Sequence, residues 1–306
     1  MSSVNSQFII TTSIVLIGYL IKRFNIINER DGEILTKLVL NVTLPALVIS
    51  SASSLEFNPS LGLMPLIAVL YGLFMALLSL FLFKKQSGMS KGILSMLLPG
   101  FSVGLFAFPF VEGIWGKKAL NYTAMFDMGN SLVTFVIIYF IAFYFSSENS
   151  RFDFRSITKK IFSSIPLIVY MLTLISSITG LRFPSIIVDI SHAVGKANMP
   201  ISMLALGIFL NFKMDSSNWR NIIKVLAARY LIGLTLGILQ FHTLPLDLII
   251  RKIILICLIL PPPMSTLAFT VHFKYDKRFA GMTINVANIV SYVLMWIIFN
   301  IISSFQ

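Results

Sequence analysis

Three consecutive prolines, Pro261, Pro262 and Pro263, lie in the middle of an apolar run from residue 248 to residue 273. Proline has no N–H and clashes with the carbonyl four residues earlier, so it interrupts an α-helix. A helix in lipid must satisfy its own backbone, because lipid offers no other hydrogen-bond partners. Such a break is tolerated only inside protein or beside a water-filled cavity, and broken helices form the binding sites of secondary transporters. The run therefore predicts a broken membrane helix and a transport function.

Composition places the chain in a membrane. Of its 306 residues, 57% are hydrophobic and 12% are charged, whereas a soluble domain carries roughly 25% charged residues. The apolar runs are long enough to predict an all-α polytopic protein with the lipid bilayer as its surroundings. A net charge of +12 would suit nucleic-acid binding in a soluble protein, but membrane proteins collect Lys and Arg in cytoplasmic loops. We therefore expect no nucleic-acid partner.

Ten spans are predicted, and the charges between them indicate an orientation. The loops after odd-numbered spans hold fifteen Lys and Arg residues, and those on the opposite side hold five. The positive-inside rule places the fifteen in the cytoplasm and both termini outside. Spans two, four, seven and nine contain Pro or Gly and are expected to be interrupted. The predicted spans are residues 7–21, 33–54, 61–83, 92–113, 121–145, 161–180, 187–210, 221–241, 248–273 and 279–302.

A faint internal repeat divides the chain into residues 1–150 and residues 151–306, on either side of a polar stretch at residues 146–160. Residues 41–45 align with residues 196–200 at an offset of 155. Because each half would hold five spans, an odd number, the repeat is expected to be inverted across the membrane. Further aligned pairs are Leu98-Pro99 with Leu260-Pro261 and Lys117-Lys118 with Lys277-Arg278.

Span four, with Pro99, Gly100 and Gly104, is the expected counterpart of the break in span nine. The proline triplet is predicted to release the carbonyls of residues 257–259 and to leave the N–H groups of residues 264–267 open. If both breaks reach the middle of the bilayer, two half-helix N-termini converge there and favour an anion such as a carboxylate. A structural kink is the alternative at either break. The residues expected to bind substrate at this crossover are Pro99, Ser102, Gly104, Pro261, Pro262, Pro263, Ser265 and Thr266.

Polar residues in other spans could line the path of the substrate or pair neighbouring helices. Asn285, Asn288 and Ser291 have the spacing that places them on roughly one face of a helix, which must face protein or water. The expected wall or coupling residues are Asn41, Thr43, Pro45, Asp127, Asn130, Asn198, Pro200, Asn285 and Asn288.

Asp127 is the one acid well inside a predicted span. A charge in the hydrocarbon costs at least ~2.5 kcal/mol and usually faces a cavity or a partner. We expect Asp127 either to relay a proton or to form a buried pair with Lys196 or Arg229. Lys224 lies near a cytoplasmic helix end, and its side chain is expected to reach the interface.

Several function classes are disfavoured by the motifs. The single cysteine, Cys257, excludes an intrachain disulfide and a cysteine metal site, and the three histidines are scattered, so we expect no resident cofactor or metal. The sequence has no G-x-x-x-x-G-K-[ST] loop for ATP-driven pumping and no His-Glu-x-x-His protease motif, and we expect no enzyme. It also has no Thr-Val-Gly-Tyr-Gly potassium filter.

Five segments, in order along the chain, resemble the auxin efflux carrier family. The first is Leu38-Val39-Leu40-Asn41-Val42-Thr43-Leu44-Pro45-Ala46-Leu47; the others are residues 104–116 with Pro109, residues 127–130, residues 199–207, and residues 261–269 followed by Tyr275-Asp276. Bacterial members of this family are membrane transport proteins of the malate/malonate permease type. Ser102 and Ala107 stand where members usually have Asn and Gly, a departure that bears on the substrate and not on the fold.

The resemblance implies two inverted five-helix repeats in which the broken spans four and nine cross. A scaffold part and a transport part would then move past each other in an elevator-like way. It also implies a bacterial cell membrane, organic anions as substrates, and a homodimer as one arrangement of the chains.

We therefore predict a secondary-active carrier of a small organic anion, such as malate, malonate or an auxin-like acid, that works by alternating access. H+ and Na+ both remain open as coupling ions. The alternatives are a sodium-coupled symporter of the bile-acid type and a passive membrane channel.

Overall fold

The computed structural model describes residues 3–52, 58–86, 88–146, 154–211 and 219–303, and all regular structure in these ranges is helical. Within them, six helical stretches are long and apolar enough to cross a membrane: Val4–Arg23, Glu29–Ala52, Pro59–Leu82, Val103–Tyr144, Trp219–Thr243 and Lys277–Ile302. The all-helical class is confirmed. The count of ten spans stays a prediction, because the remaining predicted spans are divided into shorter helices. The predicted boundary between the two halves falls at residues 147–153, outside the described residues.

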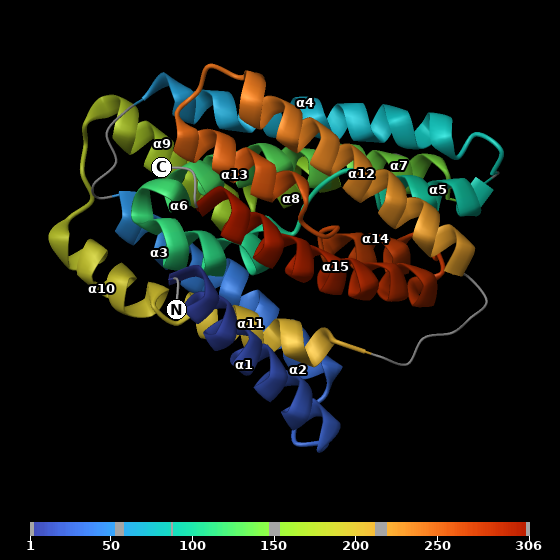
Figure 1. Cartoon of the computed structure of the whole chain (residues 1–306), viewed down its shortest axis with the longest axis horizontal. Coiled ribbons are helices and arrows are strands. Elements are labelled where there is room, and N and C mark those ends of the chain that lie inside the picture. The colour runs from blue at the N-terminus through green and yellow to red at the C-terminus, as the bar shows by residue number, and fades with distance from the viewer. Residues whose placement is uncertain (1–2, 53–57, 87, 147–153, 212–218, 304–306) are drawn as a thin grey trace.

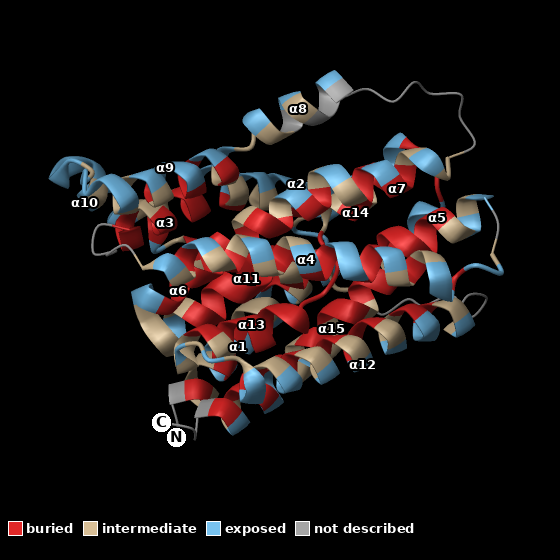
Figure 2. Ribbon diagram, turned by 90° about the horizontal axis from the view of Figure 1, so that it is seen from above, coloured by how far each residue is buried: buried red, intermediate tan, exposed pale blue. Residues whose placement is uncertain are grey.

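The helices pack as two bundles that lie against each other (Figure 1). The first bundle contains α1 (Ser3–Arg23), α2 (Glu29–Leu38), η1 (Val39–Thr43), α3 (Leu44–Ala52), α9 (Ile165–Thr179), α10 (Ser185–Gly195) and α11 (Asn198–Phe209). The second contains α4 (Pro59–Leu82), α5 (Gly88–Met96), η2 (Val103–Ala107), α6 (Phe108–Leu132), η3 (Val133–Ile138), α7 (Tyr139–Tyr144), α12 (Trp219–Thr243), α13 (Leu248–Leu258), α14 (Ser265–His272) and α15 (Lys277–Ser303). The short helix α8 (Phe154–Phe162) lies at the edge of the molecule (Figure 2).

Glycines let helices within each bundle approach at backbone distance. A Cβ on Gly207 of α11 would lie 2.0 Å from the carbonyl oxygen of Val15 in α1. In the second bundle, a Cβ on Gly129 of α6 would lie 2.2 Å from the carbonyl oxygen of Pro65 in α4. Both distances exclude any larger residue at the present spacing, as is usual for small residues between membrane helices.

The outer faces of both bundles are apolar. Leu70, Leu77 and Phe81 of α4 are 56%, 67% and 64% exposed, and the exposed residues of the outer helices run along one side of each ribbon (Figure 2). In a soluble protein such a surface would mark an interaction site. On helices of this length it is the surface that faces lipid.

Three of the four spans that were expected to be interrupted are interrupted: spans four, seven and nine. Span two stays helical from Glu29 to Ala52 and changes only to a π-helical turn at η1, just ahead of Leu44 and Pro45. In span seven, α10 ends three residues before α11 begins, ahead of Pro200. The long stretch that follows the break in span four also bends, at Gly116, whose φ is +74°. That bend lies between the ranges predicted for spans four and five.

The breaks in spans four and nine are the most complete. Residues 97–102 separate α5 from η2, and residues 259–264 separate α13 from α14. The predicted open N–H groups are partly wrong, since Thr266 and Leu267 donate to the carbonyls of Pro263 and Met264 at 3.0 Å. A tight turn ahead of α14 satisfies these two groups, and the open N–H groups in the described structure are those of Met264 and Ser265.

Candidate functional site

The two broken segments cross each other in the second bundle. The N–H of Ser102 donates to the carbonyl of Pro261 at 2.9 Å. Gly100 has a φ of +76°, and a Cβ there would lie 3.3 Å from Cγ of Pro263. The structure thereby brings the two predicted breaks together from segments about 160 positions apart, with Ser102 and Pro261 in contact. The substrate-binding role of Pro99, Ser102, Gly104, Pro261, Pro262, Pro263, Ser265 and Thr266 stays a prediction.

Arg229 of α12 binds backbone carbonyls of both broken segments. Its Nε and Nη2 donate to the carbonyl of Leu260 at 2.9 and 2.7 Å, and Nη2 also donates to that of Gly100 at 2.7 Å. Nη1 donates to the carbonyls of Leu97 and Leu98 at 3.3 and 2.6 Å. All five N–H groups of the guanidinium are thus used. The side chain is 1% exposed, and in the described structure no carboxylate pairs with it.

The carbonyls that need outside donors differ from those predicted. The carbonyl of Cys257 accepts the N–H of Leu260 within the chain. The carbonyl of Ile259 accepts the hydroxyl of Ser291 in α15 at 2.7 Å, so the prediction is right for Ile259 and wrong for Cys257. The carbonyls of Leu260 and Pro261 also take outside donors, from Arg229 and Ser102. A proline is expected to leave the carbonyl four residues earlier without a partner. Here the turn at residues 257–260 gives the carbonyl of Cys257 a partner within the chain.

Asn130 of α6 satisfies the first break from the other side. Its side chain accepts the N–H of Phe101 and donates to the carbonyl of Phe101, both at 2.8 Å. Its amide also donates to Asp127 at 2.9 Å, and the hydroxyl of Tyr170 in α9 donates to the same carboxylate at 2.8 Å. The predicted ion pair of Asp127 with Lys196 or Arg229 is wrong. Asp127 instead links the crossover to the first bundle through Tyr170.

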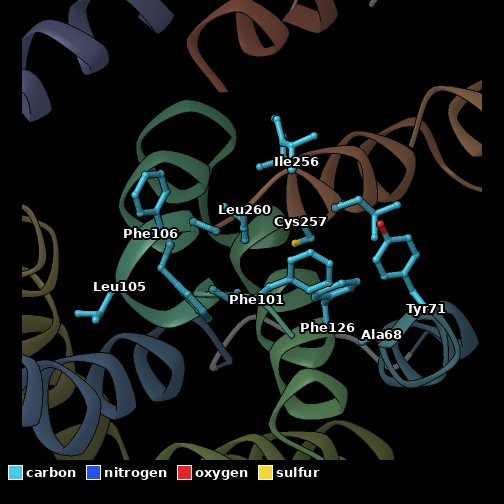
Figure 3. Packing of buried hydrophobic residues seen from close by; sticks show 14 of the residues in the cluster. Ala68, Tyr71, Phe101, Leu105, Phe106, Phe126, Ile256, Cys257 and Leu260 are labelled. Atoms are coloured by element: carbon cyan, nitrogen blue, oxygen red, sulfur yellow. The ribbon is translucent and has the colours of Figure 1, made fainter. Parts of the chain in front are cut away.

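The crossover is packed in aromatic and aliphatic side chains. Phe101 lies among Phe126, Tyr71 and Cys257 (Figure 3), and the guanidinium carbon of Arg229 lies 4.8 Å from the centre of the Phe101 ring. This surrounding excludes water from the back of the crossover, so the hydrogen bonds of Arg229 act in a medium of low dielectric.

A cavity of about 860 Å³ leads to the front of the crossover. It follows α15 from Lys277 to Asn288, about 16 Å along the helix axis, and Met264 at the start of α14 lines its inner part. The volume suits a small molecule. Of the predicted wall residues, Asn285 and Asn288 lie on this cavity, and Oδ1 of Asn285 has no partner in the described structure.

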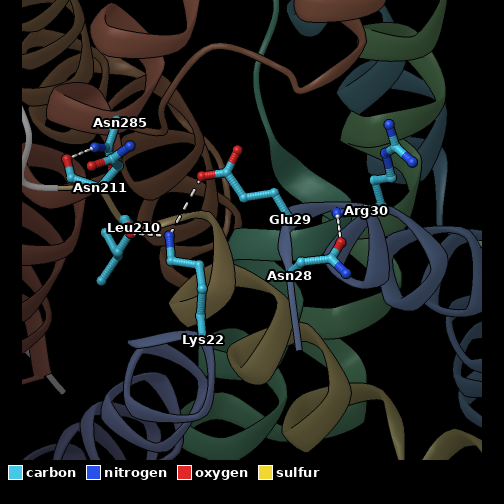
Figure 4. Close-up of polar contacts among 7 residues, drawn as sticks. All are labelled: Lys22, Asn28, Glu29, Arg30, Leu210, Asn211 and Asn285. Atoms are coloured by element: carbon cyan, nitrogen blue, oxygen red, sulfur yellow. Dashed lines mark hydrogen bonds and ion pairs between the residues drawn. The ribbon is translucent and has the colours of Figure 1, made fainter. Parts of the chain in front are cut away.

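The mouth of the cavity lies between the two bundles and carries charges of both signs. Glu29 and Glu33 of α2 face Lys277 and Arg278 of α15 across it. Lys22 forms an ion pair with Glu29 at 3.6 Å and donates to the carbonyl of Leu210. The amide of Asn285 donates to the carbonyl of Asn211, which joins α15 to the end of α11 (Figure 4).

A cluster of aromatic rings joins the two bundles near the start of α1 and the later turns of α15. Phe8 of α1 contacts Phe110 and Tyr292 with ring centroids 4.7 and 5.6 Å apart, and Phe106 contacts Tyr292 at 6.4 Å. Phe299 of α15 completes the group at 5.9 Å from Phe8. We call these five rings the aromatic seal. It joins the first bundle to the second where the cavity does not reach.

The remaining predicted residues lie away from the cavity. Thr43 and Asn198 are buried against each other, with a hydrogen bond of 3.2 Å, and Pro45 and Pro200 follow them in α3 and α11. Asn41 is exposed, and its amide donates to the carbonyl of Lys37 in its own helix. Gly104 packs against Leu40 and Leu44 of the first bundle.

Residues 4–299 match the model of a family described as membrane transport protein. An uncharacterized transporter of the archaeon Methanocaldococcus jannaschii is 22% identical over 308 residues, covering 95% of this chain and 98% of the relative. An uncharacterized transporter of the archaeon Methanothermobacter thermautotrophicus is 26% identical over 205 residues, which cover 65% of this chain and 66%, just under two thirds, of that relative. Each similarity is to a transporter.

Proposed function

The chain belongs to the membrane transport protein family, the family of the auxin efflux carriers, and on that premise we propose that it is a secondary-active carrier of a small organic anion. The observation that carries the proposal is the crossing of two broken helices, held by Ser102 and Pro261, next to a cavity of small-molecule size. Membership in a transporter family is not membership in an enzyme class, and the residues at the crossover have binding roles in this proposal.

The electrostatics of the crossover favour a negatively charged substrate. In the described structure, Arg229 has no paired carboxylate and instead neutralises the carbonyl ends of the two half-helices, so these ends do not repel an anion. The N–H groups of Met264 and Ser265 open at the start of α14, where the helix dipole is positive. A carboxylate at the inner part of the cavity would accept from these groups, and Asn285 and Asn288 would bind a second polar group of the substrate.

We further propose ten spans in two inverted repeats, with the first bundle as scaffold and the second as the moving part. Thr43 and Asn198 support this symmetry, because they are equivalent positions at the offset of 155 and bind each other. A residue that contacts its equivalent in the other repeat lies near the two-fold axis that relates the two repeats. Trp296 near the end of α15 binds Asn5 near the start of α1, which supports both termini lying on one side, the outside.

The arrangement corresponds to an inward-facing state. The cavity opens beside the ends of α1, α11 and α14, where the predicted cytoplasmic loops lie, and the aromatic seal closes the other side. Movement of the second bundle along the first would close the cavity and open the seal, which is alternating access. A sodium-coupled symporter and a passive channel remain as alternatives. A bacterial cell membrane and a homodimer stay expectations from the resemblance.

Uptake into proteoliposomes tests the function. Labelled malate, malonate, lactate and indole acetate would be offered to the purified protein, with proton, sodium and potential gradients imposed separately. We expect saturable uptake of one acid, reduced in Ser102→Ala. Sodium-dependent uptake would favour the symporter, and single-channel conductance far above carrier turnover would favour the channel. Folded protein that takes up none of the acids would contradict the organic-anion proposal and leave the family membership untouched.

A further inference from the structure

We propose that the guanidinium of Arg229 is a built-in cation of the crossover, filling the position where a coupling sodium ion would otherwise bind. The crossover is therefore sodium-independent, and the positive charge that balances its two half-helix C-terminal ends is permanent. The consequence for transport rests on the proposed function, whereas the binding chemistry rests on the geometry around Arg229 alone.

The carbonyls bound by Arg229 form the kind of cage that holds a monovalent cation. They come from Leu97, Leu98, Gly100 and Leu260, directly after the C-terminal ends of α5 and α13. Each half-helix ends with roughly half a negative charge. In transporters with broken helices, such unwound carbonyls and half-helix C-terminal ends coordinate sodium. Here two such ends point at one guanidinium.

Most hydrogen-bond acceptors around Arg229 already have donors, so few remain to bind a second cation. All five donors of Arg229 are used, and neighbouring carbonyls are taken by other groups: Ile259 by Ser291, Pro261 by Ser102 and Phe101 by Asn130. The nearby carboxylate of Asp127 is occupied by Asn130 and Tyr170. In the described residues no group of three or more His, Cys, Asp or Glu side chains could hold a metal ion.

A tethered cation has a different consequence from a bound ion. Arginine stays protonated in proteins, and it cannot leave with the substrate. A sodium gradient would then supply no driving force, and the two half-helix C-terminal ends would stay neutralised on both sides of the membrane.

Thermal unfolding of the purified full chain in detergent tests the cage without any substrate. At constant ionic strength, the Tm of the wild type is expected to be equal in sodium chloride and choline chloride. Arg229→Ala should lower Tm by about 5 °C or more, because it leaves buried carbonyls unpaired. Guanidinium at roughly 20 mM, far below its denaturing range, or sodium should then raise the Tm of the variant saturably. Lys224→Ala is the matched control, an exposed charge on the same helix, and should show neither effect.

Two further variants keep the test decisive if Arg229→Ala does not fold. Arg229→Lys keeps the charge, and Arg229→Gln keeps an amide without it, so a cation site predicts the higher Tm for Arg229→Lys. The reverse order would overturn the proposal. So would a saturable rise of the wild-type Tm with sodium, or a folded Arg229→Ala variant that responds to neither cation. Because these readouts need no transported acid, failure of all uptake assays would leave them interpretable.

Discussion

Asn130 replaces, with one side chain, the two backbone partners that Phe101 loses at the break. It accepts from the N–H and donates to the carbonyl of that residue and also donates to Asp127. A buried amide with this many partners is more costly to remove than an average hydrogen bond, because every group that it leaves behind is buried. The shape of the first break therefore depends on a residue of another helix.

Asn130→Ala should destabilise the protein by about 2–4 kcal/mol, since two backbone groups and a carboxylate lose a partner. Thermal unfolding in detergent measures the loss. Asn41→Ala is the control, because that amide is exposed and binds within its own helix, and it should change stability by less than about 0.5 kcal/mol. Equal losses in the two variants would show that Asn130 does not hold the break.

Tyr170→Phe removes one hydroxyl, the contact between the first bundle and Asp127. A hydrogen bond to a charged group contributes roughly 1.5–3 kcal/mol. We expect a loss of stability in this range and a changed uptake rate, measured in the same proteoliposomes. Tyr144→Phe, on a tyrosine that is 66% exposed, should alter neither. An unchanged uptake rate in Tyr170→Phe would remove this contact from the transport cycle.

The sequence located some of these residues but not their roles. The sequence marks Asn130 and Asp127 as polar residues in an apolar span, whereas it offers Arg229 only as a partner for Asp127. A buried Arg in a span signals an interaction, but the carbonyls that it binds come from segments about 130 and 30 residues away. Ser291 is marked by its spacing from Asn285 and Asn288, although its partner Ile259 is not. Tyr170 binds through a hydroxyl that is common on membrane helices, so nothing in its neighbours marks it.

The broken helices were the most predictable elements of the fold. Proline acts through its own chemistry within a few residues, so the positions of the interruptions in spans four, seven and nine could be read from the sequence. The hydrogen-bond partners of the backbone groups at these interruptions could not be read from the sequence, because they depend on how other helices pack. The turn at Thr266 and Leu267 and the separation of α8 from α9 are likewise set by local geometry that apolar periodicity does not resolve.

The double substitution Pro262→Ala and Pro263→Ala should permit a more continuous helix across the second break and lower uptake. Rebuilding the helix would draw Leu260 and Pro261 carbonyls into internal hydrogen bonds and away from Arg229 and Ser102. Pro65→Ala is the matched control, since Pro65 lies inside α4, which remains helical. Full uptake by a folded double variant would contradict the role of the break.

Gly207→Ala should push α1 and α11 apart, because the added Cβ would lie 2.0 Å from the Val15 carbonyl oxygen. We expect a loss of about 1–3 kcal/mol, measured by thermal unfolding. Gly62→Ala in α4 meets no atom within 4 Å and should instead stabilise the helix by about 0.5–1 kcal/mol. A stabilised Gly207→Ala variant would mean that the two helices can separate freely.

For the molecule as a whole, the cavity and the aromatic seal are separate features of one interface. Both are formed between the bundles, so relative movement of the bundles changes both at once. Glu29 and Glu33 belong to one bundle, and Lys277 and Arg278 to the other, and their attraction favours a narrower mouth.

Cysteine labelling in sealed vesicles tests the predicted orientation. In a Cys257→Ala background, Gly281→Cys on the cavity wall should react with an impermeant thiol reagent from the cytoplasmic side and not from the other. Lys118→Cys in the predicted outer loop should show the reverse, and Phe110→Cys in the seal should react from neither side. Labelling of Gly281→Cys from outside would overturn the assigned orientation.

The helix α9 has a consequence for the membrane itself. Its fifteen residues span about 22 Å, whereas a hydrocarbon core is about 30 Å thick and the twenty-four residues of α4 cross it fully. Ile168, Leu172 and Ile175 of α9 face outward, so a locally thinner bilayer would match this helix. The transport rate should then depend on the acyl-chain length of the lipid. Short-chain lipids should reduce the difference between the length of α9 and the bilayer thickness, and long-chain lipids should increase it.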